Sequence, residues 1–80
     1  MDGIFSDGNL YCFQVDVYQD KSKAIDLQNE IIGLGYRSDI YIVKFGSRDW
    51  YSVRIGYFNS LENAKDFKAE FFKKTNLDLN

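Results

Sequence analysis

In two short segments of this 80-residue chain, every second side chain is polar, charged or aromatic, and side chains of these types often bind ligands. The first holds Gln14 and Asp16, and the second holds Trp50, Ser52 and Arg54. Alternate side chains of a β-strand share one face, so each set lies on one surface. Aromatic rings beside amide, hydroxyl, carboxylate and guanidinium groups suit a ligand built from a chain of rings. Bases stack on aromatic side chains, and sugars present C–H edges to rings and hydroxyl or amide groups to polar side chains.

The same segments offer little for catalysis. The chain has no histidine, which removes the commonest general base and metal ligand. Cys12 is the only cysteine, so the chain forms no internal disulfide and lacks the ligands of a zinc site. Asp16 and Asp39 belong to strands that a third strand should separate, and no base is available to activate Ser52 or Cys12. We therefore predict no catalytic residue, no metal site and no cofactor.

Composition and charge narrow the classes of partner. The chain is 45% hydrophobic and 18% aromatic, which is enough for a small core. Its net charge is -2 and it has no run of lysines or arginines, so we expect no nucleic-acid partner. No apolar run approaches the ~18 residues that span a bilayer, so we expect no direct membrane insertion by this chain. If the parent protein is exported, its targeting segment lies outside these residues.

The elements that position the two segments follow one pattern twice. Residues 11–32 and 51–72 each start with alternating apolar side chains, which indicate a strand, and continue with helical spacing. We expect strands at 10–18, 38–45, 49–57 and 77–79, and helices at 21–34 and 60–74. A loop over residues 46–49 should join the middle strands into a hairpin. Residues 1–9 are predicted to be a flexible lead-in, and residues 10–80 a single domain.

Helix ends are marked by specific residues. Asp20 or Ser22 is expected to cap the first helix and Ser60 the second, because their oxygens accept from free backbone amides. Gly35 supplies a left-handed residue that ends the first helix.

This order of elements predicts an α+β fold of the βαββαβ type, the split βαβ or ferredoxin-like arrangement. Right-handed crossovers place both helices on one face of a four-stranded antiparallel sheet, with strands 10–18 and 49–57 adjacent at its centre. By alternation, the helices cover Phe13, Val15, Ile40, Ile42, Val53 and Ile55, and Tyr57 points to the same side as Val53 and Ile55. The uncovered face then carries Cys12, Gln14, Asp16, Asp39, Tyr41, Val43, Phe45, Trp50, Ser52 and Arg54.

The uncovered face is the predicted binding surface. The hairpin should place Phe45 opposite Trp50 and Tyr41 near Arg54. An aromatic cross-strand pair also stabilises a sheet by ~0.2–1 kcal/mol without any ligand, and a solvated ion pair between Asp16 and Arg54 would contribute little. Soluble monomers rarely leave so much apolar area exposed, which favours a binding role. The candidate ligand-binding residues are Gln14, Asp16, Tyr41, Phe45, Trp50, Ser52 and Arg54.

Three segments resemble the SPOR (sporulation-related repeat) domain: "FQVDVY" at 13–18, "GYRSDI" at 35–40 and "WYSVRIGYFNSLENA" at 50–64. The resemblance covers residues 11 to about 79. It implies the βαββαβ fold and binding of septal peptidoglycan, with a preference for glycan strands that lack stem peptides. In that family the glycan lies along the bare face of the sheet. Gln14 matches the family's first-strand glutamine, and Trp50 matches the aromatic residue that enters its third strand.

The chain departs from the family pattern at three places. Asp16 stands where the family has glycine, Ser52 where an arginine is common, and Gly56-Tyr57 where Gly-Pro is usual. Arg54 lies two residues further on the same face and is our candidate to replace the missing arginine.

The resemblance predicts a non-catalytic module that brings a larger bacterial envelope protein to the division septum or cell wall. Its place would be the cell envelope, in the periplasm or at the cell-wall face, through a parent protein whose targeting segment is absent here. We expect a monomer, with a weak dimer as the alternative state.

Two other functions remain open. A protein-interaction or self-association module on the same fold would have lost glycan binding, and Ser52 and Asp16 support this alternative. Single-stranded RNA binding uses the same topology but needs aromatic residues on both central strands. Here the first central strand presents Cys12, Gln14 and Asp16, and the chain is acidic, so we rank RNA binding below the others.

Overall fold

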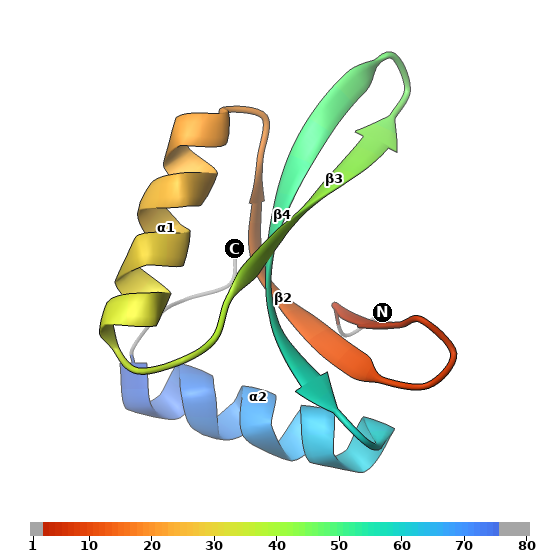
Figure 1. The fold of residues 1–80 in the computed structure, drawn as a ribbon, viewed down its shortest axis with the longest axis vertical. Coiled ribbons are helices and arrows are strands. Elements are labelled where there is room, and N and C mark those ends of the chain that lie inside the picture. Colours follow the sequence, from red (N-terminus) through yellow and green to blue (C-terminus); the bar gives the residue numbers. More distant parts are fainter. Residues whose placement is uncertain (1–2, 76–80) are drawn as a thin grey trace.

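The structure is a computed structural model, and it describes residues 3–75. Its elements are β1 (Ile4–Ser6), β2 (Tyr11–Tyr18), α1 (Lys21–Gly33), β3 (Asp39–Phe45), β4 (Arg48–Phe58) and α2 (Leu61–Thr75). The strands form one antiparallel sheet in the order β1-β2-β4-β3 (Figure 1). The predicted α+β class is confirmed, with β2 and β4 adjacent at the centre of the sheet.

Both helices pack against the same face of the sheet (Figure 1). Phe13 of β2 lies at the centre of this contact and is 0% exposed. Its ring centroid lies 5.8 Å from that of Phe71 and 6.1 Å from those of Phe58 and Phe67. Interlocked rings of this kind remove a large apolar area from water and fix the helices on the sheet. The buried hydrophobic cluster consists of Phe13, Val15, Ala24, Ile31, Val53, Ile55 and Phe71.

The strand β1 was not expected from the sequence, which suggested a flexible lead-in over residues 1–9. Ile4 pairs with Phe13 and Phe5 with Cys12, so these residues extend the sheet beyond β2. Asp7 closes the connecting turn, since its carboxylate accepts hydrogen bonds from the backbone N–H groups of residues 9 and 10 at 2.9 and 2.8 Å. The strand predicted at 77–79 lies outside the described residues.

The predicted helix ends are confirmed. The Asp20 carboxylate accepts from the backbone N–H of Ser22 at 2.9 Å, and Ser60 Oγ accepts from that of Asn63 at 3.1 Å. Gly35 follows the last turn of α1 with φ of +95°, the left-handed conformation that glycine adopts without strain.

The β3–β4 hairpin projects beyond both helices (Figure 1). Its strands are joined by the two-residue turn Gly46-Ser47, so that Phe45 pairs with Arg48. As a result Ile42 is 62% exposed, although alternation places it on the helix side. The prediction that the helices cover Ile42 is therefore wrong, because the hairpin extends past the ends of the helices that would cover it.

Candidate functional site

No helix among residues 3–75 lies over the second face of the sheet, which we call the open face. Two irregularities in the pairing of β2 with β4 decide which side chains reach it. At the first, Gln14 pairs with Arg54 but Asp16 pairs with Val53, which leaves Val15 as an extra residue in a β-bulge. The bulge reverses the alternation that follows it.

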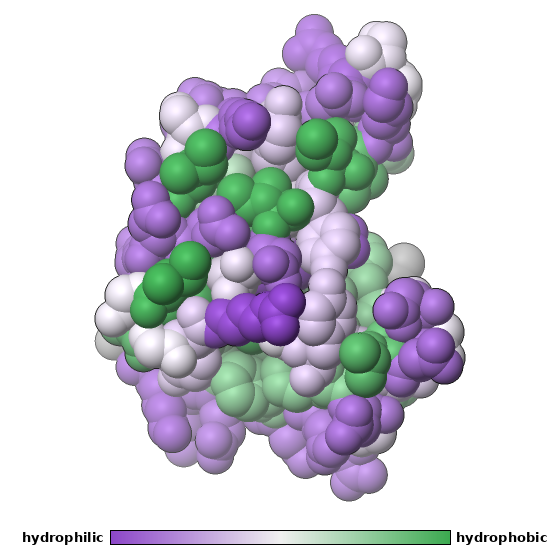
Figure 2. All heavy atoms as spheres, viewed as in Figure 1, coloured by the Kyte–Doolittle hydropathy of each residue, from purple (hydrophilic) through white to green (hydrophobic). Residues whose placement is uncertain are grey.

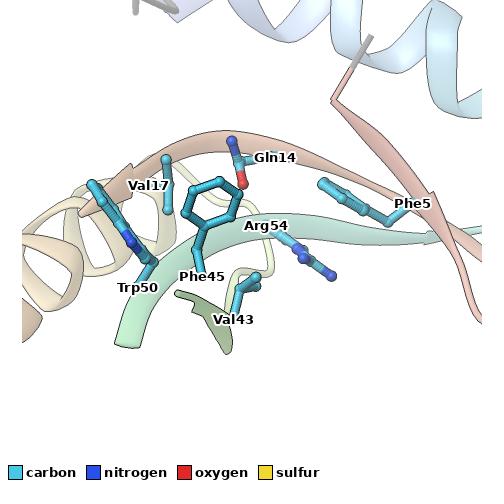
Figure 3. Close-up of a pocket in the computed structure, with 7 residues that line it drawn as sticks. All are labelled: Phe5, Gln14, Val17, Val43, Phe45, Trp50 and Arg54. Carbon is cyan, nitrogen blue, oxygen red and sulfur yellow. The ribbon is translucent and has the colours of Figure 1, made fainter. Parts of the chain in front are cut away.

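The bulge moves Asp16 off the open face. Asp16 shares its side of the sheet with the buried Val53, and its carboxylate accepts from the backbone N–H of Val17 at 2.7 Å. Val17 instead lies opposite Ser52 and lines the open face (Figure 3). The prediction that Asp16 lies beside Gln14 on this face is wrong, since simple alternation cannot detect an inserted residue.

The second irregularity acts on Tyr57. Cys12 pairs with Gly56, and the register then shifts by one residue, leaving Tyr57 without a partner in β2. Tyr57 was expected on the helix side of the sheet, but its hydroxyl forms a hydrogen bond with that of Tyr41 on the open face. This hydrogen bond, together with burial, raises the pKa of Tyr41 to about 12.

Gly56 permits the close approach of the two strands at this point. A Cβ atom added to Gly56 would lie 2.8 Å from Cys12 Cβ and 3.5 Å from the Tyr11 carbonyl oxygen. Any larger residue would push β2 and β4 apart at the second irregularity.

A chain of hydrogen bonds crosses the centre of the open face. Arg54 Nε donates to Ser52 Oγ at 2.9 Å, and Ser52 Oγ donates to Gln14 Oε1 at 2.6 Å. Ser52 is 0% exposed, so it holds Gln14 and Arg54 in place from beneath them. Among the described residues the Gln14 Nε2 group has no acceptor, which leaves its two N–H donors for a ligand.

Two aromatic rings hold the Arg54 guanidinium. Its central carbon lies 3.8 Å from the ring centroid of Phe5 and 4.6 Å from that of Tyr41. Both distances are within the range of a cation–π contact. Tyr41 lies near Arg54 as predicted, whereas Phe5 comes from the unexpected strand β1.

The open face carries a groove of about 310 Å³, which we call the aromatic groove (Figure 3). In the space-filling view, the surface is concave between the β3–β4 hairpin and the hairpin formed by β1 and β2 (Figure 2). Trp50 pairs with Val43 rather than Phe45, because the turn is shorter than predicted, yet both rings line the groove. The lining residues are Phe5, Gln14, Val17, Val43, Phe45, Trp50 and Arg54.

A second hollow of about 300 Å³ lies on the other side of Arg54, and we call it the N-terminal hollow. It shares Phe5 and Arg54 with the aromatic groove. Burial raises the pKa of the Cys12 thiol in its wall, so this sulfur is held in the protonated, unreactive form at neutral pH. The lining residues are Phe5, Ser6, Asp7, Leu10, Cys12, Tyr41, Arg54 and Tyr57.

The structure thus gathers most, but not all, of the predicted residues. Gln14, Phe45, Trp50 and Arg54 line the aromatic groove, Ser52 lies beneath it, Tyr41 lines the N-terminal hollow, and Asp16 is on the opposite face. Sequence reasoning missed Phe5, Val17 and Tyr57. For Phe5 the available signal was the apolar pair Ile4-Phe5 just before the turn residues Asp7-Gly8.

Residues 3–75 contain no group of three or more His, Cys, Asp or Glu side chains placed to hold a metal ion. Within the same residues, no helix has both the length and the apolar character needed to cross a membrane.

Comparison with known proteins gives one match. The family model of the SPOR domain matches residues 7–78, nearly the whole chain. No curated protein and no solved structure matches it. The matched range begins after β1, so Phe5 lies outside it.

Proposed function

Because the chain belongs to the SPOR domain family, which is known for binding peptidoglycan at the septum, we propose that its aromatic groove binds a glycan strand of peptidoglycan. Members of this family are generally non-catalytic binding domains, and we assign this chain the same role. It would bring a larger envelope protein to the division septum or the cell wall, in the periplasm or at the cell-wall face.

The observation that carries the proposal is that Gln14 and Trp50 line the same groove, on the face of the sheet that no helix among residues 3–75 covers (Figure 3). Trp50 and Phe45 offer aromatic surface to the C–H edges of sugar rings, and Val17 and Val43 complete an apolar lining. The Gln14 amide offers two donors to a sugar hydroxyl or an N-acetyl carbonyl oxygen. Because the Ser52 hydroxyl fixes this amide, little side-chain entropy is lost when it binds.

The direct experiment is co-sedimentation of the purified domain with amidase-treated sacculi, whose glycan strands lack stem peptides. We expect the wild-type chain to pellet with the sacculi and Trp50→Ala to remain in the supernatant. Ile42→Ala is the matched control, since Ile42 is 62% exposed on the same hairpin but points to the other side. Failure of the wild-type chain to pellet would remove the proposed function, and unchanged pelleting of Trp50→Ala would remove the site.

Self-association is a second candidate function, and the exposed end of the β3–β4 hairpin favours it. Phe45 is 77% exposed and Ile42 62% exposed, and by alternation they lie on opposite sides of the same edge strand, β3. Apolar area of this kind often marks an interface. Sedimentation equilibrium separates the two functions, because dimerisation that disappears in Phe45→Ser, together with no binding to sacculi, would favour self-association.

A further inference from the structure

The strand β3 has an outer edge to which no other segment of residues 3–75 is paired. The sheet order β1-β2-β4-β3 places β3 at one margin, and its pairing with β4 has no irregularity. A long, regular edge strand offers a row of free backbone N–H and C=O groups to another strand, and proteins often protect such an edge with a proline or a bulge. The strand β3 contains neither.

The register of the hairpin shows which backbone groups point outward. A two-residue turn closes on a hydrogen-bonded pair, which here is Phe45 with Arg48. Hydrogen-bonded and non-hydrogen-bonded pairs alternate along an antiparallel ladder, so the N–H and C=O groups of Ile40, Ile42 and Lys44 point away from β4. Within the described part of the chain, no group bonds to these outward N–H and C=O groups.

Exposed apolar side chains flank this edge on both faces of the sheet. Val43 and Phe45 lie on the open face, Ile42 lies on the helix side, and all three are exposed. A strand added to the edge would contact these side chains as well as the free backbone groups. It would therefore bury apolar area on both faces.

The flank of α1 beside β3 is apolar as well. Gln28 Nε2 donates to the carbonyl oxygen of Ser38 at 2.9 Å, so this flank of the helix faces the start of β3. Ile25 and Ile32 lie one turn before and one turn after Gln28 on the same flank, and both are exposed. In the space-filling view, hydrophobic side chains lie over α1 and over the neighbouring part of the β3–β4 hairpin (Figure 2).

The charges of the hairpin favour an antiparallel copy of the same strand as the partner. Asp39 begins β3, whereas Lys44 and Arg48 lie at the turn. Among residues 3–75, neither Lys44 nor Arg48 forms an ion pair. Antiparallel pairing of two copies brings Asp39 of each copy close to the cations of the other, whereas parallel pairing would bring like charges together.

We propose that β3 is a dimerisation edge, at which two copies of the chain pair their β3 strands antiparallel about a two-fold axis at Ile42. Ile42 then faces its own counterpart, and Tyr41 faces Val43 of the second copy. The end residues Asp39 and Phe45 face each other. In this register the outward N–H and C=O groups of each copy bond to those of the other.

The dimer leaves the aromatic groove accessible. A two-fold axis between antiparallel strands is perpendicular to the sheet, so both open faces lie on the same side of the joined sheet. Neither copy then covers the groove of the other. The inference goes beyond the proposed function and does not depend on it.

The test is sedimentation equilibrium of the purified chain without ligand, from about 10 µM to about 1 mM. One strand edge buries less area than a standard interface, so we expect a dissociation constant on the order of 100 µM. Ile42→Lys places two like charges opposite each other on the axis and should weaken the dimer at least about tenfold. Leu61→Lys is the matched control, because it makes the same change at an exposed residue of α2, which does not contact β3, and it should keep the dissociation constant within about twofold.

Disulfide trapping tests the register. Ile42→Cys should form a covalent dimer under mild oxidation, because the two introduced thiols face each other within the range of a disulfide. Lys44→Cys lies on the same side of the same strand but faces Ile40 of the second copy, so its thiols lie beyond that range and should cross-link much more slowly. The wild-type chain, whose Cys12 is buried, gives the background rate.

The outcomes are distinct. A chain that stays monomeric at about 1 mM overturns the dimer and leaves the proposed function standing, since binding to sacculi is measured separately. Equal weakening by Ile42→Lys and Leu61→Lys would show that net charge controls association, and this result also overturns the dimer. Equal cross-linking of Ile42→Cys and Lys44→Cys overturns the antiparallel register. Because Ile42 is exposed, its variants should keep the thermal midpoint of the wild-type chain.

Discussion

The central strands β2 and β4 supply side chains to both faces of the sheet, but the two faces carry different kinds of side chain. On the helix face, Phe13 and Val53 are 0% exposed and belong to the buried hydrophobic cluster. On the open face, the centre is a chain of polar side chains, and the aromatic rings stand at the margins, where Phe45 is 77% exposed. Neighbouring residues of β4 alternate between these faces, so a substitution one residue further along tests a different property.

This difference separates stability from binding. A well-packed core contributes stability in proportion to the apolar area and volume it fills. Rings and fixed donors left in contact with water contribute little to folding and instead suit a ligand. We therefore expect substitutions on the helix face to lower the free energy of unfolding, and substitutions on the open face to lower affinity.

The largest effect is expected for Phe71→Ala. The ring of Phe71 is 1% exposed and packs on Phe13, so its loss leaves a cavity that should cost about 3–5 kcal/mol of unfolding free energy. The matched control is Phe45→Ala, which removes the same ring from an exposed position and should change stability by no more than about 0.5 kcal/mol. Urea denaturation measures both, and equal losses for the two variants would contradict the comparison.

A smaller effect is expected at Gly56, where β2 and β4 approach each other closely. Gly56→Ala forces a Cβ atom to within 2.8 Å of Cys12 Cβ, and overpacking of this kind costs about 1–3 kcal/mol. Gly33→Ala is the control, since nothing lies within 4 Å of the added atom and the residue is helical. That variant should be neutral or more stable by up to about 1 kcal/mol. Thermal unfolding that gives the two variants the same midpoint would argue against the close approach.

The smallest effect concerns Cys12, which lies on the open face yet is only 7% exposed. Burial raises its pKa above the usual 9.0, so the folded state favours the neutral thiol. Its contribution to stability is complete below pH 9.0 and is lost as the pH rises through the folded-state pKa. We expect alkylation by iodoacetamide at pH 8 to be slower in the folded chain than in urea. Equal rates would show that the centre of the open face is accessible to solvent.

Sequence periodicity was sufficient to predict the long elements because it records which side chains meet the core. The alternation of Val53 and Ile55, and the helical spacing of Ala24 and Ile31, correctly identified the covered face. The helix caps at Asp20 and Ser60 were predictable for a different reason. Each cap is a hydrogen bond between residues two or three positions apart, so it depends only on the local sequence.

The details of the site were less predictable, because they depend on pairing between strands. Asp16 and Tyr57 were assigned to the wrong face because of the irregularities in the β2–β4 register. Asp16 directly follows the first irregularity, and Tyr57 is the unpaired residue of the second. Phe5 reaches the Arg54 guanidinium only through the pairing of β1 with β2, and three residues are too few to show a period. Long-range pairing of this kind leaves no local pattern in the sequence.

The most direct test of the account is chemical-shift mapping by NMR during titration with glycan strands that lack stem peptides. We expect the indole N–H of Trp50 and the side-chain amide of Gln14 to shift with increasing ligand. The backbone signals of α1 and α2, which cover the other face, should stay within the variation seen with an unrelated oligosaccharide. Shifts confined to the helices, with the Trp50 and Gln14 signals unmoved, would contradict a binding site on the open face.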